Sequence, residues 1–131
     1  MSENSNEMPL LTFNSLYNIL REEKRTKKLQ KLPELFYEAL EKFILDKKGE
    51  IKKLKEQGGD TEKLKKEKYI LQNSKKISYE LLNLRFVKIS NIAIKNKIFE
   101  DEILAEENIL NKEKNFFNGV QKEIGSVMKN L

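Results

Sequence analysis

The chain has 131 residues, with no cysteine, no histidine, and 26 Lys and Arg residues against 21 Asp and Glu residues. The lack of cysteine and histidine excludes disulfides, thiol nucleophiles, the commonest general base and nearly all zinc sites. Two prolines and five glycines are too few for a protein made of many turns, so the composition predicts a single all-α domain. The net charge of +5 weakly favours an anionic partner.

Residues 1–8 are polar and lack helical periodicity, so we expect a flexible amino-terminal tail over 1–11, followed by a helical domain over 12–131. No apolar run approaches the roughly 18 residues that a membrane-spanning helix needs. The tail also lacks the basic-then-apolar pattern of a targeting signal. The sequence therefore predicts a cytoplasmic protein that makes no membrane contact.

The first helix is expected to start near Thr12, whose side chain could cap it, and to end around Thr26. Leu16, Tyr17 and Leu20 give this helix an apolar face. Its last turns are basic, which suits the negative end of a helix dipole. A phosphate-binding patch is the less favoured interpretation of the same residues.

A second helix is predicted to begin at Pro33, because proline disfavours helical geometry at Leu32 and suits the first helical position itself. One apolar face follows at spacings of three and four residues, formed by Leu35, Phe36, Ala39, Leu40, Phe43 and Ile44. Phe36 lies on this face and is expected in the core. Tyr37 lies about 100° further round the helix, where its hydroxyl suits a partly wet subunit contact.

Paired glycines in the segment EQGGD, residues 56–60, predict the tip of a helical hairpin. Residues 46–69 should form two antiparallel arms that project from the core and touch along a narrow seam. Both arms are rich in lysine, which is typical of solvated helix surface. The other interpretation is a site for nucleic-acid phosphates, although no aromatic platform for base stacking accompanies the lysines. Its candidate contacts are Lys52, Lys53, Lys65 and Lys66.

The stretch ISYELLNLRFVKISNIAI, residues 77–94, is the most apolar part of the chain and lies in a third helix expected over 61–96. Two apolar stripes run along it, so two surfaces are needed to cover them. So short a chain has few helices to supply them. We therefore expect a bundle of about four helices with a long protruding hairpin, completed by partner subunits, and an isolated chain that self-associates or aggregates. The partner-interface candidates are Leu32, Pro33, Tyr37, Leu81, Leu84, Arg85, Phe86 and Ile89.

Arg85 is the one cation in the middle of this apolar surface. Its long side chain could reach the rim of the surface and expose its charge there. The sharper interpretation is an ion pair, either with Glu80 or with a carboxylate of another chain.

The acidic run EDEILAEE, residues 100–107, is expected at the start of the last helix, where negative charge is favourable. Apolar residues from Ile103 to Ile124 should give that helix a broad buried face. The run lacks the spacing of a calcium loop, and the sequence offers no second carboxylate cluster. We therefore expect no bound metal and no cofactor.

Three stretches together resemble the helical domain of GINS, the replication-fork complex: LQKLPELFYEAL, LLNLRFVKISNIA and LAEE. The likeness is to the archaeal subunit type in which the helical domain precedes a small β-domain, and it covers most of residues 12–124. Its specific positions are Leu29-Gln30, Leu32-Pro33 and Phe36-Tyr37. Two features depart from the pattern. Ala105 stands where such subunits often carry a capping threonine, and the sequence stops at Leu131, leaving no room for the β-domain.

The resemblance implies a non-enzymatic scaffold in DNA replication. GINS-like subunits form homo- or hetero-tetramers and activate the MCM replicative helicase together with a RecJ-like partner. It also implies a nucleoid-associated replisome protein that touches DNA indirectly or weakly. The main alternative is an unrelated helical hairpin that binds nucleic acid directly through its lysine-rich arm, and a carboxylate-only enzyme is a distant third.

Overall fold

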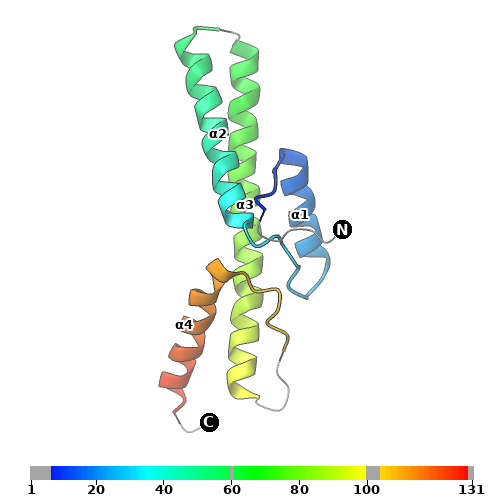
Figure 1. The fold of residues 1–131 in the computed structure, drawn as a ribbon, viewed down its shortest axis with the longest axis vertical. Coiled ribbons are helices and arrows are strands. Elements are labelled where there is room, and N and C mark those ends of the chain that lie inside the picture. The colour runs from blue at the N-terminus through cyan, green and yellow to red at the C-terminus, as the bar shows by residue number, and fades with distance from the viewer. Residues whose placement is uncertain (1–6, 60, 100–103, 130–131) are drawn as a thin grey trace.

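The computed structural model describes residues 7–59, 61–99 and 104–129, which form helices and loops and contain no strand. Four helices follow one another along these residues: α1 (Phe13–Arg25), α2 (Phe36–Glu56), α3 (Thr61–Ile98) and α4 (Asn111–Val127). α3 runs the length of the molecule, and the other three helices pack mainly against it (Figure 1). The predicted all-α bundle is confirmed.

α1 begins where the sequence predicts, because Thr12 and Ser15 cap it reciprocally. The Thr12 hydroxyl accepts a hydrogen bond from the Ser15 N–H at 3.1 Å, and the Ser15 hydroxyl accepts one from the Thr12 N–H at 2.8 Å. Leu11 is buried in the core, so the packed chain starts inside the tail predicted over 1–11. The first six residues of that tail lie outside the described residues.

α2 begins three residues later than predicted. The Pro33 carbonyl accepts a hydrogen bond from the Phe36 N–H at 3.0 Å, and this turn precedes the helix instead of forming its first residues. Phe36 is fully buried, as predicted. The neighbouring Tyr37 ring packs edge-on against it, with ring centroids 5.5 Å apart.

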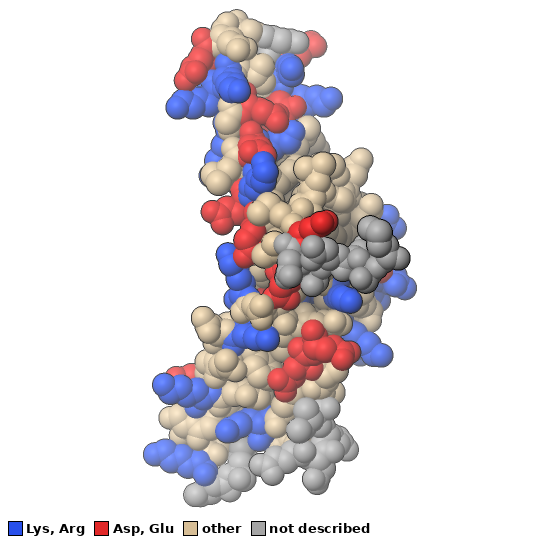
Figure 2. Space-filling model, viewed as in Figure 1, with Lys and Arg blue, Asp and Glu red and all other residues tan. Residues whose placement is uncertain are grey.

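The protruding hairpin is formed by α2 and the first half of α3, and it extends well beyond α1 (Figure 1). Gly58 lies at its tip with φ of +59°, a left-handed conformation that glycine adopts without strain. Buried Ile51 and a Lys47–Glu67 ion pair at 3.0 Å join the two arms. Blue and red side chains are interspersed along this part of the surface (Figure 2).

The acidic run 100–107 does not open the last helix, which corrects the sequence interpretation. Residues 100–103 lie outside the described residues, and the chain from 104 to 110 is loop. Asn96 holds that loop: its Nδ2 donates to the Leu104 carbonyl at 3.0 Å, and its Oδ1 accepts from the Leu104 N–H at 2.6 Å. Glu106 also accepts from Asn96, so this carboxylate caps no helix.

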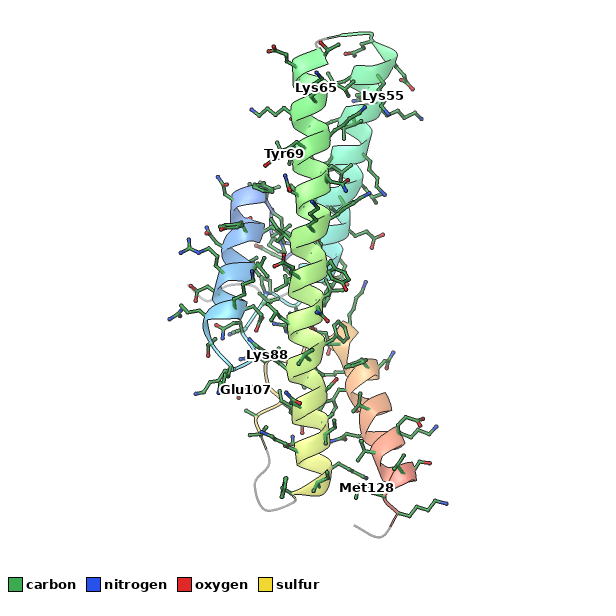
Figure 3. The ribbon with its side chains drawn as sticks, turned by 180° about the vertical axis from the view of Figure 1, so that it is seen from behind. Lys55, Lys65, Tyr69, Lys88, Glu107 and Met128 are labelled. Atoms are coloured by element: carbon green, nitrogen blue, oxygen red, sulfur yellow. The ribbon has the colours of Figure 1, made fainter. Side chains whose placement is uncertain are left out.

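Two apolar clusters bury the stripes of α3 against helices of the same chain. The first packs α1 and the start of α2 onto the middle of α3 and includes Leu16, Leu20, Phe36, Leu40, Ile77 and Leu81. The second packs α4 onto the last turns of α3 and consists of Leu29, Ile89, Ile92, Ala93, Ile109 and Phe117, with Val120 partly buried. Seen from behind, α3 stands in the foreground with one side uncovered (Figure 3).

Candidate functional site

A fully buried arginine, Arg85, lies at the centre of α3. Its Nε and Nη2 donate to the two carboxylate oxygens of Glu113 at 2.8 and 2.9 Å. Its Nη1 donates to the Glu23 carboxylate and to the Gln30 carbonyl, both at 2.9 Å. Nη2 also donates to the Asn108 carbonyl at 3.1 Å. A guanidinium has five N–H groups, so every donor of this side chain is used.

Glu113 receives the guanidinium as a planar fork, the strongest geometry for an arginine–carboxylate pair. It is the third residue of α4 and also accepts from the Leu110 N–H at 2.9 Å, which caps that helix. The Tyr37 hydroxyl donates a further hydrogen bond to it. A single buried carboxylate thus joins α2, α3 and α4.

Glu23 is the second fully buried carboxylate and comes from the last turns of α1. Besides Arg85, it binds Lys88 Nζ at 2.6 Å. Lys88 Nζ also donates to the backbone carbonyls of Glu23 and Lys28, at 2.6 and 3.0 Å. The lysine therefore satisfies a carbonyl at the end of α1 that the helix itself leaves unpaired, and ties the connector after α1 to α3 through the Lys28 carbonyl.

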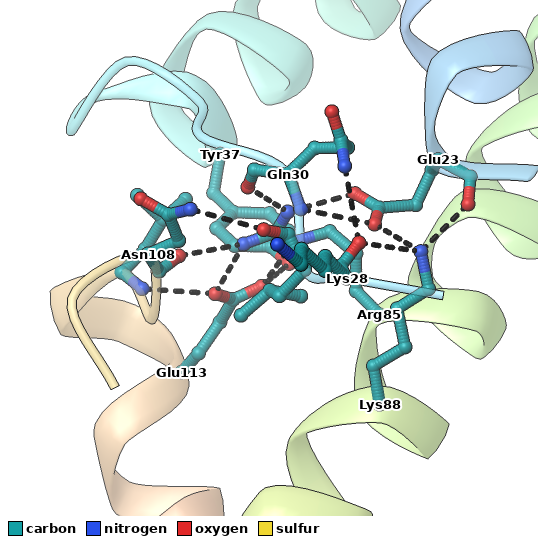
Figure 4. Close-up of polar contacts among 10 residues, drawn as sticks. Glu23, Lys28, Gln30, Tyr37, Arg85, Lys88, Asn108 and Glu113 are labelled. Carbon is teal, nitrogen blue, oxygen red and sulfur yellow. Dashed lines mark hydrogen bonds and ion pairs between the residues drawn. The ribbon is translucent and has the colours of Figure 1, made fainter. Parts of the chain in front are cut away.

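We call these side chains the Arg85 cluster: Glu23, Tyr37, Arg85, Lys88 and Glu113 (Figure 4). Two cations and two carboxylates cancel in formal charge. Members come from all four helices, and carbonyls of both the α1–α2 connector and the α3–α4 loop complete the network. The cluster is where every described segment except the hairpin tip is tied together.

The pKa shifts follow from burial and from these bonds. Burial raises the pKa of the Glu113 carboxyl, but the hydrogen bonds from Arg85, Tyr37 and the Leu110 N–H outweigh it, so the net pKa lies below the ordinary glutamate value. Burial and the bond to Glu113 both raise the pKa of the Tyr37 hydroxyl. Burial lowers the pKa of Arg85, and its two carboxylates more than restore it. Arg85 and Glu113 therefore keep their charges, and the Tyr37 hydroxyl stays neutral.

This arrangement suits a structural role better than a catalytic one. A general base needs a free lone pair within reach of a substrate, whereas these carboxylates are sealed from solvent and occupied by donors. Removing any one charged member would leave its partners buried and uncompensated, which is strongly destabilising. Among the described residues, no three acidic side chains are grouped in a way that could hold a metal ion.

Four of the predicted partner-interface residues are buried within the chain, which corrects that assignment. Leu81, Arg85 and Ile89 have no exposed surface, and Leu32 has 9%. The reason is that α1, α2 and α4 cover most of both stripes of α3. The buried part of the stripes therefore gives no motive for expecting an isolated chain to aggregate, although Val87 of the first stripe stays 55% exposed.

Arg85 does not reach the rim of the apolar surface. It pairs with carboxylates, as its second predicted arrangement had it, but within the chain and not with Glu80, which forms a surface ion pair with Lys24 at 3.0 Å. Its two partners, Glu23 and Glu113, were missed. Glu113 could have been suspected, because glutamate at the third position of a helix often caps it. Glu23 resembles any other charged residue on a basic helix end.

The remaining interface candidates keep some exposed surface. Pro33 is exposed, while Tyr37, Leu84 and Phe86 are half-buried. The Phe86 ring packs edge-on against Phe116 of α4, with ring centroids 4.6 Å apart. Tyr37 and Leu84 pack against the same core cluster that contains the buried candidates Leu32 and Leu81, so their apolar surface is used largely within the chain.

The candidate nucleic-acid contacts are all exposed: Lys52 and Lys53 on α2, and Lys65 and Lys66 on α3. They lie near the end of the hairpin, well away from the Arg85 cluster (Figures 1 and 3). Acidic side chains of the same hairpin lie among them (Figure 2). The structure therefore presents separate lysines on a mixed surface.

Comparisons with protein-family models, with curated proteins and with solved structures found no match to this chain. Among the described residues, no helix is both long enough and apolar enough to cross a membrane. The functional argument therefore depends on the sequence and on the geometry described above.

Proposed function

We propose that the chain is a non-catalytic scaffold subunit of a GINS-like complex that binds and activates the MCM replicative helicase. The proposal is supported by the positions of the three stretches that resemble the GINS family. LQKLPELFYEAL supplies the Gln30 carbonyl and Tyr37, and LLNLRFVKISNIA supplies Arg85 and Lys88. LAEE directly precedes Asn108, whose carbonyl binds Arg85. Residues of two of the three stretches, and the residue that directly follows the third, thus meet at the Arg85 cluster.

That convergence supports the proposal because a motif that holds a fold should appear wherever the fold is used. Leu29 and Leu32 are buried on either side of Gln30, which fixes the connector against α3. Phe36 then starts α2 from a fully buried position. Three of the six specific positions of the likeness, Leu29, Leu32 and Phe36, are therefore buried in the core.

The test is co-expression with GINS-type partner subunits, followed by measurement of mass in solution and of DNA unwinding by an MCM helicase. We expect a complex of four subunits and faster unwinding when the chain is present. A chain that stays apart from every GINS-type subunit and leaves unwinding unchanged would contradict the proposal.

The second candidate function is direct nucleic-acid binding by the hairpin, which the exposure of Lys52, Lys53, Lys65 and Lys66 favours. If these lysines neutralise phosphates, the affinity of the isolated chain for DNA should fall steeply with salt. Reversal of all four to glutamate should then abolish binding. If the scaffold proposal holds, the same variant should assemble normally and stimulate unwinding as well as the parent does.

A further inference from the structure

Among the described residues, nothing packs against one side of α3 (Figure 3). α1, α2 and α4 contact its other sides, and the rear view shows α3 uncovered in the foreground (Figure 3). Three large apolar side chains point outward from α3: Tyr69, Tyr79 and Val87 are 69%, 74% and 55% exposed. A soluble protein often exposes single apolar residues, but their alignment along one helix needs an explanation.

Six residues lie in one line along the uncovered side of α3, at steps of four, three, four, three and four residues. We call these residues the α3 seam: Tyr69, Asn73, Lys76, Glu80, Asn83 and Val87. Such spacing places side chains in one line along a helix, where a second helix can pack against them. Asn73 is half-buried and the other five are exposed, so the line is available to another chain.

The seam is complementary to itself when a second copy runs antiparallel. Placing the midpoint between Lys76 and Glu80 sets each Lys76 opposite the second copy's Glu80, giving two reciprocal ion pairs. The same register sets Asn73 opposite Asn83 and Tyr69 opposite Val87, so amide meets amide and apolar meets apolar. A parallel register would set Lys76 against Lys76 and Glu80 against Glu80, which like charges oppose.

The surface at this midpoint also suits a second helix. A shallow hollow lies there, lined by Gln72, Lys75, Lys76, Tyr79 and Glu80. Tyr79 flanks the seam at the level of the midpoint, so both copies would place a tyrosine close to the symmetry axis. A ring with a hydroxyl suits such a partly wet contact. Within the described residues Lys76 has no ion pair, and Glu80 has only its surface pair with Lys24.

We propose that two copies of this chain pair antiparallel through the α3 seam, with Lys76 of each copy bound to Glu80 of the other. This pairing does not rest on the GINS-like role, and different measurements decide the two proposals. It uses the uncovered side of α3, which shares only Val87 with the stripes from which a partner was first predicted.

Charge reversal tests the pairing. Lys76→Glu alone and Glu80→Lys alone each place like charges at the midpoint twice, and each should weaken dimerisation at least about tenfold. The double variant restores both ion pairs and should return the dissociation constant to within about threefold of the parent. Mass in solution over a range of concentrations gives the constant, and circular dichroism checks that each variant is folded. Lys52→Glu, on α2 away from the seam, is the control and should leave dimerisation unchanged.

Orientation is tested by cross-linking, which the absence of cysteine makes unambiguous. In the antiparallel register, a 1:1 mixture of Asn73→Cys and Asn83→Cys chains should form a disulfide dimer. Neither variant alone should do so, because a residue and its own copy would lie about 15 Å apart along the helix. Three results would each overturn the proposal. The parent chain could stay monomeric at every concentration, or either cysteine variant could form a disulfide dimer by itself. The double charge variant could also dimerise as weakly as the single variants.

Discussion

The middle of α3 and its first turns are held in different ways. Around Arg85 the helix is covered by α1, α4, the start of α2 and two loops, and its buried partners Glu23 and Glu113 lie 62 and 28 residues away. Along the hairpin it meets α2 alone, and the Lys47–Glu67 pair spans 20 residues. The same helix is thus fixed by long-range contacts at its centre and by local contacts at its end.

The two regions should therefore contribute unequally to the stability of the protein. Buried polar networks are lost as a unit, because removing one member leaves the others unsatisfied. A two-helix hairpin with a narrow seam can open locally while the rest of the molecule stays folded. The changes below should therefore have large effects in the Arg85 cluster and small effects in the hairpin.

The largest effect is expected from Arg85→Ala. It leaves Glu23 and Glu113 buried without their shared cation, which should cost roughly 3–5 kcal/mol of unfolding free energy or prevent folding altogether. Arg85→Lys should also be severe, since an ammonium offers three donors where five are used. Urea denaturation followed by circular dichroism gives the values. A loss below about 1 kcal/mol for Arg85→Ala would show that the cluster does not hold the fold.

A matched pair of core truncations sharpens the contrast. Phe36→Ala removes a fully buried ring beside the cluster and should cost roughly 3–5 kcal/mol. Ile51→Ala, at a buried position in the hairpin, should cost about 2 kcal/mol, because the two arms can close on the space. Both values come from the same denaturation experiment. Equal losses would mean that the hairpin is packed as firmly as the middle.

The helices themselves could largely be predicted, because their signals are local. Thr12 caps the segment that it precedes, and the glycines at the hairpin tip interrupt a regular apolar spacing. The start of α4 was mispredicted because the acidic run satisfies the preference of a first turn. The sequence gives no sign that Asn96, eight residues before Leu104, would hold that run as a loop.

The Arg85 cluster could not be predicted from the sequence. Arg85 within an apolar stripe indicates that some group must compensate its charge, but it does not indicate which one. Glu23 and Glu113 are two of 21 acidic residues, and the sequence does not distinguish a buried, paired glutamate from a solvated one. The pairing depends on how α1 and α4 dock on α3, which no local pattern encodes.

Low pH should destabilise the Arg85 cluster through protonation of Glu113. Its folded-state pKa lies below the unfolded value of about 4.3, so its pairing stabilises the fold above that pH and is lost as pH falls through the folded pKa. Glu113→Gln should lower the unfolding free energy by about 1–3 kcal/mol at neutral pH. When the pH is lowered below about 4, the unfolding free energy of this variant should fall less than that of the parent. Denaturation at stepped pH measures both slopes. Parallel slopes for the two proteins would exclude this carboxylate as the acid-sensitive group.

The smallest effect is expected in the hairpin. Burial lowers the pKa of Lys47, but the bond to Glu67 and the nearby Glu50 raise it above its ordinary value, so the lysine stays charged. Lys47→Met should nevertheless cost no more than about 1 kcal/mol, since the pair lies near the surface and the apolar methionine side chain still covers the contact between the two arms. A loss as large as that of Arg85→Ala would erase the distinction between the two regions.

Hydrogen exchange of the native protein, read residue by residue by NMR, measures whether α3 is held more firmly at the Arg85 cluster than in the hairpin. If the molecule is held at the Arg85 cluster, the amides of α3 from 81 to 93 should exchange only through global unfolding, with the full unfolding free energy. Amides on both sides of the hairpin tip, near 50–56 and 62–68, should exchange through local opening at lower free energy. Equal protection along the whole of α3, or faster exchange at Arg85 than at Leu64, would contradict the account.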